Sequence, residues 1–173
     1  MNAVVATDLG WGIGYKGELL ERIPEDMRRF KQITSNGVIV MGRKTFESLP
    51  RQKPLPNRVN IVMSKKVEEA DWCSKLHFRS SVEDTIKLIN GKYVDKEAFI
   101  IGGQEIYTQF LPYCNTIYMT KIKKKYKADR FFEDIDIRKD FRLVSGYDHM
   151  VHNDIKYAFL VYERVNKDKK ISY

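Results

Sequence analysis

Cysteine is scarce in this sequence, and the two cysteines, Cys73 and Cys114, stand far apart and outside any paired motif. This spacing does not indicate a disulfide framework, and it fits a reducing compartment. Histidine is also scarce, and His149 and His152 stand three residues apart without a supporting cysteine or acidic cluster. Because a metal site needs three or four convergent ligands, we expect no metal.

Long apolar runs are missing as well. None approaches the roughly 18 residues that a membrane span requires. The opening residues, MNAVVATDLGWG, have neither a basic flank nor a small-residue cleavage site, so they do not read as an export signal. We therefore expect a cytoplasmic protein with no membrane partner.

Acidic residues are outnumbered, which leaves a formal net charge of +8 at pH 7 and a dense basic run, KIKKKYK, at 121 to 127. Such runs most often form a solvated surface, and this one lacks the interleaved aromatic and basic residues of a nucleic-acid platform, so we expect no nucleic-acid partner. A basic nucleic-acid-binding domain stays the alternative from another functional class, and salt-sensitive RNA binding would support it. A smaller anion, such as a phosphorylated cofactor, would also be attracted.

What the chain does contain is an alternation of strand-like and helix-like segments over 173 residues, a length that suits one domain. Ser80 and Glu83 have the spacing of a capping box for one of the helices. The alternation predicts a mainly parallel sheet. The predicted strands are 4–7, 38–41, 59–64 and 98–101. Two predicted helices begin at Pro24 and near Lys44, and two more cover 82–90 and 105–111.

The last third of the chain changes character, because 116–122, 141–148 and 157–164 all resemble strands with little helix between them. The final two should form an antiparallel hairpin through HND at 152–154. We predict a single α/β domain over residues 1–165, with a mainly parallel central sheet flanked by helices and an antiparallel C-terminal hairpin. A polar C-terminal tail follows at 166–173, and we expect a monomer.

One acid lies on the apolar side of the helix that begins at Pro24. Ile23, Met27, Phe30 and Ile33 recur at the spacing of one helical face, and Asp26 falls within the arc that they cover. A buried carboxylate is costly unless something binds it. Asp26 is therefore a candidate functional residue.

Two strand-to-helix junctions share one design. In VIVMGRKT the strand ends at Gly42, followed by Arg43, Lys44 and Thr45, and in FIIGGQEIY it ends at Gly102 and Gly103. Glycine permits close approach of a ligand, and free amides at a helix start favour phosphate. Neither junction is a GxGxxG or Walker motif. Ligands of α/β sheets gather at the carboxyl ends of strands, where Ser64, Lys65 and Lys66 add a hydroxyl and two cations, so a phosphate-bearing nucleotide is indicated.

Five ordered motifs resemble the dihydrofolate reductase family: GIGYKGELL (12–20), IPEDMRRFK (23–31), VIVMGRKTFESLP (38–50), LPNRVNIVMS (55–64) and IIGGQEIYTQFLP (100–112). The resemblance runs from about Val4 to Glu163. It implies NADPH-dependent reduction of 7,8-dihydrofolate to 5,6,7,8-tetrahydrofolate, a place in one-carbon metabolism and sensitivity to antifolates as a class of ligand.

The resemblance assigns roles by position. Asp26 would orient the pteridine and promote its protonation through water, with Thr120 as the hydroxyl partner of that acid, and Arg58 would bind the substrate's α-carboxylate. The implied substrate-binding residues are Val5, Ala6, Asp26, Met27, Phe30, Leu49, Leu55, Arg58 and Thr120. The implied NADPH-binding residues are Ala6, Ile13, Gly14, Gly42, Arg43, Lys44, Thr45, Ser64, Lys65, Ile101, Gly102, Gly103, Gln104, Ile106 and Tyr107.

The chain departs from the family's pattern at two positions. Glu21 stands where the family usually carries tryptophan or another large apolar residue, and it would either alter the water near Asp26 or turn outward and pair with Arg22. Gln104 stands where a small residue is common. The reductase of riboflavin biosynthesis, which shares the fold and NADPH but acts on an aminopyrimidine sugar phosphate, stays the alternative, and Asp26 with Arg58 discriminates against it.

Overall fold

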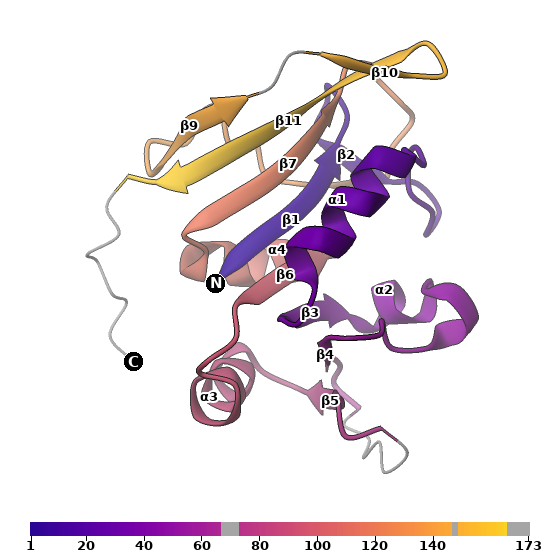
Figure 1. The fold of residues 1–173 in the computed structure, drawn as a ribbon. Coiled ribbons are helices and arrows are strands. Elements are labelled where there is room, and N and C mark those ends of the chain that lie inside the picture. Colours follow the sequence, from indigo (N-terminus) through magenta and orange to yellow (C-terminus); the bar gives the residue numbers. More distant parts are fainter. Residues whose placement is uncertain (67–72, 147–148, 166–173) are drawn as a thin grey trace.

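In the computed structural model, residues 1–66, 73–146 and 149–165 are described. Within these residues nine strands form one sheet in the order β10-β11-β7-β1-β6-β3-β4-β5, with β9 also paired to β11 (Figure 1). Its strands are β1 (Asn2–Thr7), β3 (Val38–Gly42), β4 (Val59–Met63), β5 (Leu76–Arg79), β6 (Ala98–Gly102), β7 (Thr116–Ile122), β9 (Phe141–Gly146), β10 (Met150–His152) and β11 (Ile155–Arg164). A separate two-stranded sheet joins β2 (Gly12–Gly14) to β8 (Arg130–Phe131).

The helices lie where the alternation predicts them. They are α1 (Pro24–Thr34), α2 (Arg43–Glu47), α3 (Val82–Lys92) and α4 (Gln104–Phe110), with the 3-10 turns η1 (Pro50–Gln52) and η2 (Leu111–Tyr113). No helix of the described residues is long and apolar enough to span a membrane. The capping prediction was wrong by one residue: the N-cap of α3 is Ser81, whose hydroxyl accepts from the Asp84 amide at 3.1 Å. The helix begins at Val82, so only the serine directly before it can reach the free amides.

The sheet is parallel through β7, β1, β6, β3, β4 and β5, and antiparallel where β11 joins β7, β9 and β10. This confirms the predicted α/β class with an antiparallel C-terminal part. The hairpin prediction needs a correction, because β10, not β9, turns directly into β11. Asn153 and Asp154 both have positive φ, which suits a tight two-residue turn. The predicted end of a strand at 147 and 148 and the predicted polar tail at 166–173 lie outside the described residues.

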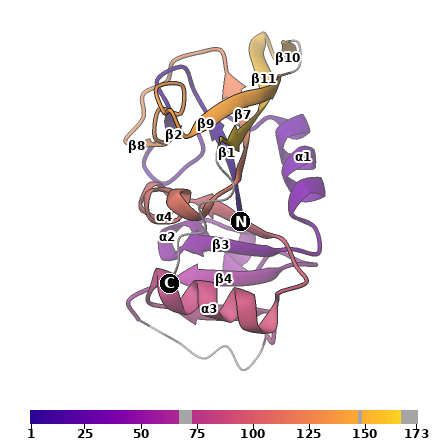
Figure 2. The ribbon, with the colours of Figure 1, turned by 90° about the vertical axis from the view of Figure 1, so that its left-hand side faces the viewer.

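Alternation along each strand divides the core between the two faces of the sheet. Helix α1 contributes Phe30 and Ile33 to a cluster with Val4 and Phe99, while α4 contributes Ile106 and Phe110 to the cluster on the other face. Figure 2 shows α1 and α4 on opposite sides of β1 and β7. Because these strands are parallel, their carboxyl ends lie along one edge of the sheet. Helix α1 packs on one face of the sheet next to that edge.

Candidate functional site

The predicted acid faces the sheet rather than solvent. Asp26 lies in the first turn of α1, and the hydroxyl of Thr120 in β7 donates to its Oδ1 at 2.5 Å. Ala6 is the register partner of Thr120 in the neighbouring strand β1, so both residues belong to the part of the sheet that α1 covers. Burial raises the pKa of Asp26, while the Thr120 hydrogen bond and the Arg29 charge oppose that shift. The net direction is upward because desolvation of the carboxylate is the largest effect.

Arg58 is the second charged group on this side of the sheet, and its residue is only 6% exposed. Its Nε donates to the Pro56 carbonyl at 3.0 Å and its Nη1 donates to the Thr34 hydroxyl at 3.0 Å. Burial lowers the pKa of the Arg58 guanidinium. Across the described part of the chain, no carboxylate forms an ion pair with it. The two hydrogen bonds fix the orientation of a guanidinium whose charge no carboxylate of the described residues balances.

The apolar residues between these two charges come from three segments. Phe30, Leu49 and Leu55 are partly buried and pack against the α1-side cluster, and the Phe30 ring lies 5.8 Å from Cζ of Arg58. Met27 is 49% exposed, because it lies at the edge of the apolar arc of α1. Val5 is buried in the cluster on the opposite face, so it would reach a ligand on the α1 side only through its backbone. The roles of Met27 and Val5 stay predictions.

The two glycine junctions lie side by side. Strand β3 pairs in parallel with β6, and Met41 is the register partner of Gly102. Gly102 has a φ of +113°, which strains any residue with a side chain, and a Cβ there would lie only 3.1 Å from the Tyr107 ring. The Gly102–Gly103 peptide is cis. A Cβ at Gly103 would meet only the Thr45 hydroxyl at 3.6 Å, which leaves that face of the glycine open.

The other residues predicted to bind a nucleotide surround this edge. Helix α2 has five residues and α4 has seven. Because such short helices have weak dipoles, side-chain donors would contribute more to anion binding here than the helix ends. Arg43 pairs with Glu47 at 3.0 Å and its guanidinium lies 5.4 Å from the centre of the Phe78 ring. Lys44 and Lys65 are exposed. The remaining positions lie in β1 (Ala6), in β2 (Ile13, Gly14), directly after β4 (Ser64), in β6 (Ile101) and in α4 (Gln104, Ile106, Tyr107).

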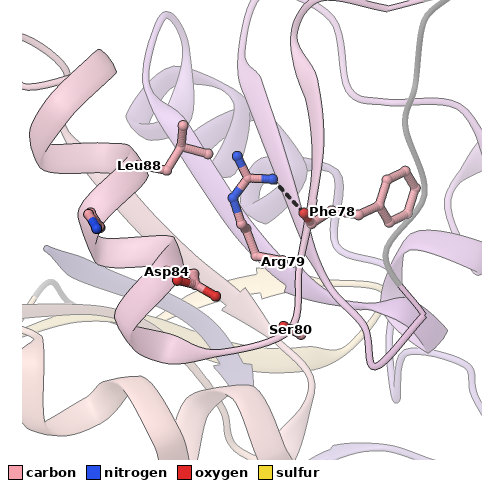
Figure 3. Close-up of a pocket in the computed structure, with 6 residues that line it drawn as sticks. Phe78, Arg79, Ser80, Asp84 and Leu88 are labelled. Carbon is pink, nitrogen blue, oxygen red and sulfur yellow. Dashed lines mark hydrogen bonds between the residues drawn. The ribbon is translucent and has the colours of Figure 1, made fainter.

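A pocket of about 350 Å³ lies at the carboxyl end of β5, and sequence reasoning missed it. Its lining comes from the end of β5, the turn after it and α3, and consists of Phe78, Arg79, Ser80, Asp84, Lys87 and Leu88 (Figure 3). The Ser64 amide donates to the Arg79 carbonyl at 2.8 Å, which joins this pocket to the predicted nucleotide residues. The pocket could not be predicted because β5, a strand of only four residues, was not among the predicted strands.

Sequence reasoning also missed the residue that organises residues 8–23, here called the glycine-rich loop. Asp8 is 1% exposed, and its Oδ1 accepts from the amides of Gly10 and Gly12, both at 2.8 Å. Its Oδ2 accepts from the Tyr126 amide at 2.8 Å. An aspartate followed by glycines at two and four positions is a recognisable local turn signal, but its partner 118 residues away has no such signal.

The structure resolves both departures from the family's pattern. The Glu21 carboxylate does not pair with the Arg22 side chain. It accepts a hydrogen bond from the Tyr126 phenol at 2.8 Å. The Arg22 guanidinium instead lies 3.5 Å from Glu18. The Gln104 side chain accepts from the Phe131 amide at 2.9 Å, so it supports β8. Among the described residues, no cluster of histidine, cysteine or acidic side chains could hold a metal ion.

Comparison with known proteins gives one consistent result. The family model described as dihydrofolate reductase matches residues 1–164. The dihydrofolate reductase of Bacillus subtilis (strain 168) is 38% identical over 169 residues, which are 96% of this chain and 95% of that protein. Dihydrofolate reductase type 9 of Escherichia coli is 31% identical over 169 residues, 96% of this chain and 94% of its own. The bifunctional dihydrofolate reductase-thymidylate synthase of Paramecium tetraurelia is 34% identical over 158 residues, 90% of this chain and 33% of that protein.

Proposed function

We propose, because the chain belongs to the dihydrofolate reductase family, that it reduces 7,8-dihydrofolate to 5,6,7,8-tetrahydrofolate with NADPH as the hydride donor. Family membership supports an oxidoreductase. The identities of the substrate and the cofactor are our proposal. Each is supported by the positions of charged residues.

One observation carries the choice of substrate: a half-buried carboxylate, Asp26, and a buried guanidinium, Arg58, stand at opposite ends of α1. Asp26 is in its first turn, and Arg58 is bonded to Thr34, its last residue. Eight residues of helix separate Asp26 from Thr34, which corresponds to about 12 Å. A ligand that satisfies both groups has hydrogen-bond donors on a heterocycle at one end, a carboxylate at the other and a flat apolar linker between. Dihydrofolate has this form, and Phe30, Leu49 and Leu55 would contact the linker.

The chemistry requires a proton on the ring nitrogen beside the carbon that receives the hydride. Asp26 would accept hydrogen bonds from the pteridine's amino group and adjacent nitrogen, which fixes the ring's orientation and stabilises positive charge on it. The raised pKa of Asp26 keeps a proton available in this part of the site at a higher pH than an exposed aspartate would. Thr120 fixes the carboxylate's orientation, and a water carries the proton to the ring.

The residues at the strand ends fit a phosphorylated dinucleotide. The open face of Gly103 permits backbone approach, and Thr45 offers a hydroxyl beside it. Arg43, Lys44, Ser64 and Lys65 would bind phosphate oxygens, including a 2′-phosphate, since this set combines cations with a hydroxyl donor. NADPH supplies the hydride when it is bound. The chain's contribution is to orient it and to exclude water from the path of transfer.

A spectrophotometric assay tests the proposal directly. NADPH absorbance should fall when enzyme and dihydrofolate are both present, and should stay constant when either is omitted. Replacing dihydrofolate with an aminopyrimidine sugar phosphate tests the riboflavin-pathway alternative in the same cuvette. Oxidation that needs the sugar phosphate and ignores dihydrofolate would overturn the assignment.

A further inference from the structure

We propose that Tyr126 is a positioning residue that holds both ends of the glycine-rich loop, and that its hydroxyl thereby sets cofactor affinity. The kinetic half of this inference rests on the proposed function. The structural half does not, because it concerns contacts within the chain.

The first end of the loop is held through the Tyr126 backbone. The Asp8 carboxylate accepts hydrogen bonds from three amides, two from the loop itself at Gly10 and Gly12 and one from Tyr126. A buried carboxylate with three amide donors is strongly fixed in orientation. The Asp8 carboxylate therefore links the start of the loop to the segment that follows β7.

The second end is held through the Tyr126 side chain. Its phenol donates to Glu21 at 2.8 Å, across 105 residues of sequence. Burial and the neighbouring Glu21 carboxylate raise the pKa of Tyr126 to about 12, so the phenol stays a donor well beyond neutral pH. Glu21 replaces the large apolar residue that the family's pattern leads one to expect, so this hydrogen bond takes the place of a packing contact.

Only two residues separate Glu21 from α1. Ile23 is 2% exposed and packs in a small cluster with Ile122 and Tyr157, against which Tyr126 also rests. The same stretch of chain thus carries Thr120, which orients Asp26, and Tyr126, which binds the loop. The loop also contains Ile13 and Gly14, which are predicted to bind NADPH. Removing the Tyr126 hydroxyl should therefore loosen these two residues while leaving Asp26 in place.

The test compares Tyr126→Phe with Glu21→Leu, Glu21→Gln and a matched control, Tyr162→Phe. The control loses the same kind of bond, a phenol donating to the Asp136 carboxylate at 2.7 Å, on strand β11, which is outside the loop. Tyr126→Phe and Glu21→Leu should each raise the KM for NADPH about three- to tenfold, the range that corresponds to the net contribution of one ordinary hydrogen bond. Glu21→Gln keeps an acceptor oxygen and should stay within about twofold of the parent.

Amide hydrogen exchange gives a readout that does not depend on activity. In the ligand-free protein, amides of residues 9–22 should exchange at least about threefold faster in Tyr126→Phe and Glu21→Leu, and no faster in Tyr162→Phe. The double variant Tyr126→Phe with Glu21→Leu should be no worse than the more affected single variant, since both remove one bond.

Unchanged exchange in the loop of both single variants would overturn the inference, whatever the enzyme's activity. Equal KM changes in Tyr126→Phe and the Tyr162→Phe control would overturn it as well, because they would show a general loss of rigidity. If the parent protein fails to oxidise NADPH with dihydrofolate, the proposed function falls, and the exchange experiment alone decides whether Tyr126 holds the loop.

Discussion

Asp26 shows at the scale of one residue how a functional group is kept at a cost. Its carboxylate accepts one hydrogen bond from Thr120 and lies near the Arg29 charge, yet burial still raises its pKa. The folded state therefore binds this proton more tightly than the unfolded chain does. The contribution to stability is fully present below the unfolded pKa and is lost as the pH rises through the folded pKa.

Asp26→Asn should separate stability from activity. The amide keeps an acceptor for Thr120 and removes the desolvated charge, so the variant should melt at a higher temperature than the parent at pH 7. That advantage should vanish near pH 4, close to the ordinary aspartate pKa. Turnover should fall on the order of 10²-fold or more, because charge and orientation at the pteridine are lost. Thermal unfolding at several pH values, with steady-state kinetics, checks both, and a less stable variant or near-normal turnover would contradict the account.

Arg58→Lys tests the other charged residue. Lysine keeps the charge but loses the planar fork that now binds the Pro56 carbonyl and the Thr34 hydroxyl. We expect the KM for dihydrofolate to rise about tenfold, with kcat within about threefold, because the contact is remote from the reacting carbon. The control is a dihydropterin without the carboxylate-bearing tail. Parent and variant should reduce it equally well, and an equal loss with both substrates would rule out carboxylate recognition.

At the scale of elements, the sequence predicted long and strongly patterned segments and missed short ones. Helix α1 and strand β7 appear where periodicity placed them, and Asp26 was recognisable because it broke the apolar face of α1. Strands β2, β5 and β8 are two to four residues long and carry no usable period. The bonds of Asp8 and Glu21 to Tyr126 depend on chain pairing over more than 100 positions, which no local pattern encodes.

Lys44 and Lys65, which follow β3 and β4, are proposed to give the preference for NADPH over NADH. Replacing Lys44 and Lys65 with glutamine should reduce the preference for NADPH over NADH, measured as the ratio of kcat/KM values, by at least about tenfold, since charge-assisted bonds to phosphate are lost. The matched control is Lys75→Gln with Lys139→Gln, which removes the same charge from two exposed residues away from this edge. An unchanged ratio, or an equal change in the control, would exclude these lysines as the source of the preference.

At the scale of the whole molecule, the net charge of +8 acts on every anionic ligand that approaches. Proposed substrate and cofactor are both anions, and the cations Lys44 and Lys65 lie exposed at the strand ends where the cofactor would bind. A field of this sign speeds encounter, and salt weakens it because the Debye length falls to about 10 Å at 0.1 M ionic strength.

Raising the ionic strength from about 0.01 to about 0.2 M should therefore lower the association rate constant of NADPH about three- to tenfold, while its dissociation rate constant changes little. NADH carries less negative charge, so its association should slow by a smaller factor. Stopped-flow measurement of intrinsic fluorescence on cofactor binding gives both rate constants. The Lys75→Gln, Lys139→Gln variant separates the effect of the protein's net charge from the effect of the cations at the strand ends. If the field of the whole molecule drives encounter, this variant should lose part of the salt dependence, just as the Lys44→Gln, Lys65→Gln variant does. A salt effect confined to dissociation, or identical for NADPH and NADH, would contradict electrostatic steering.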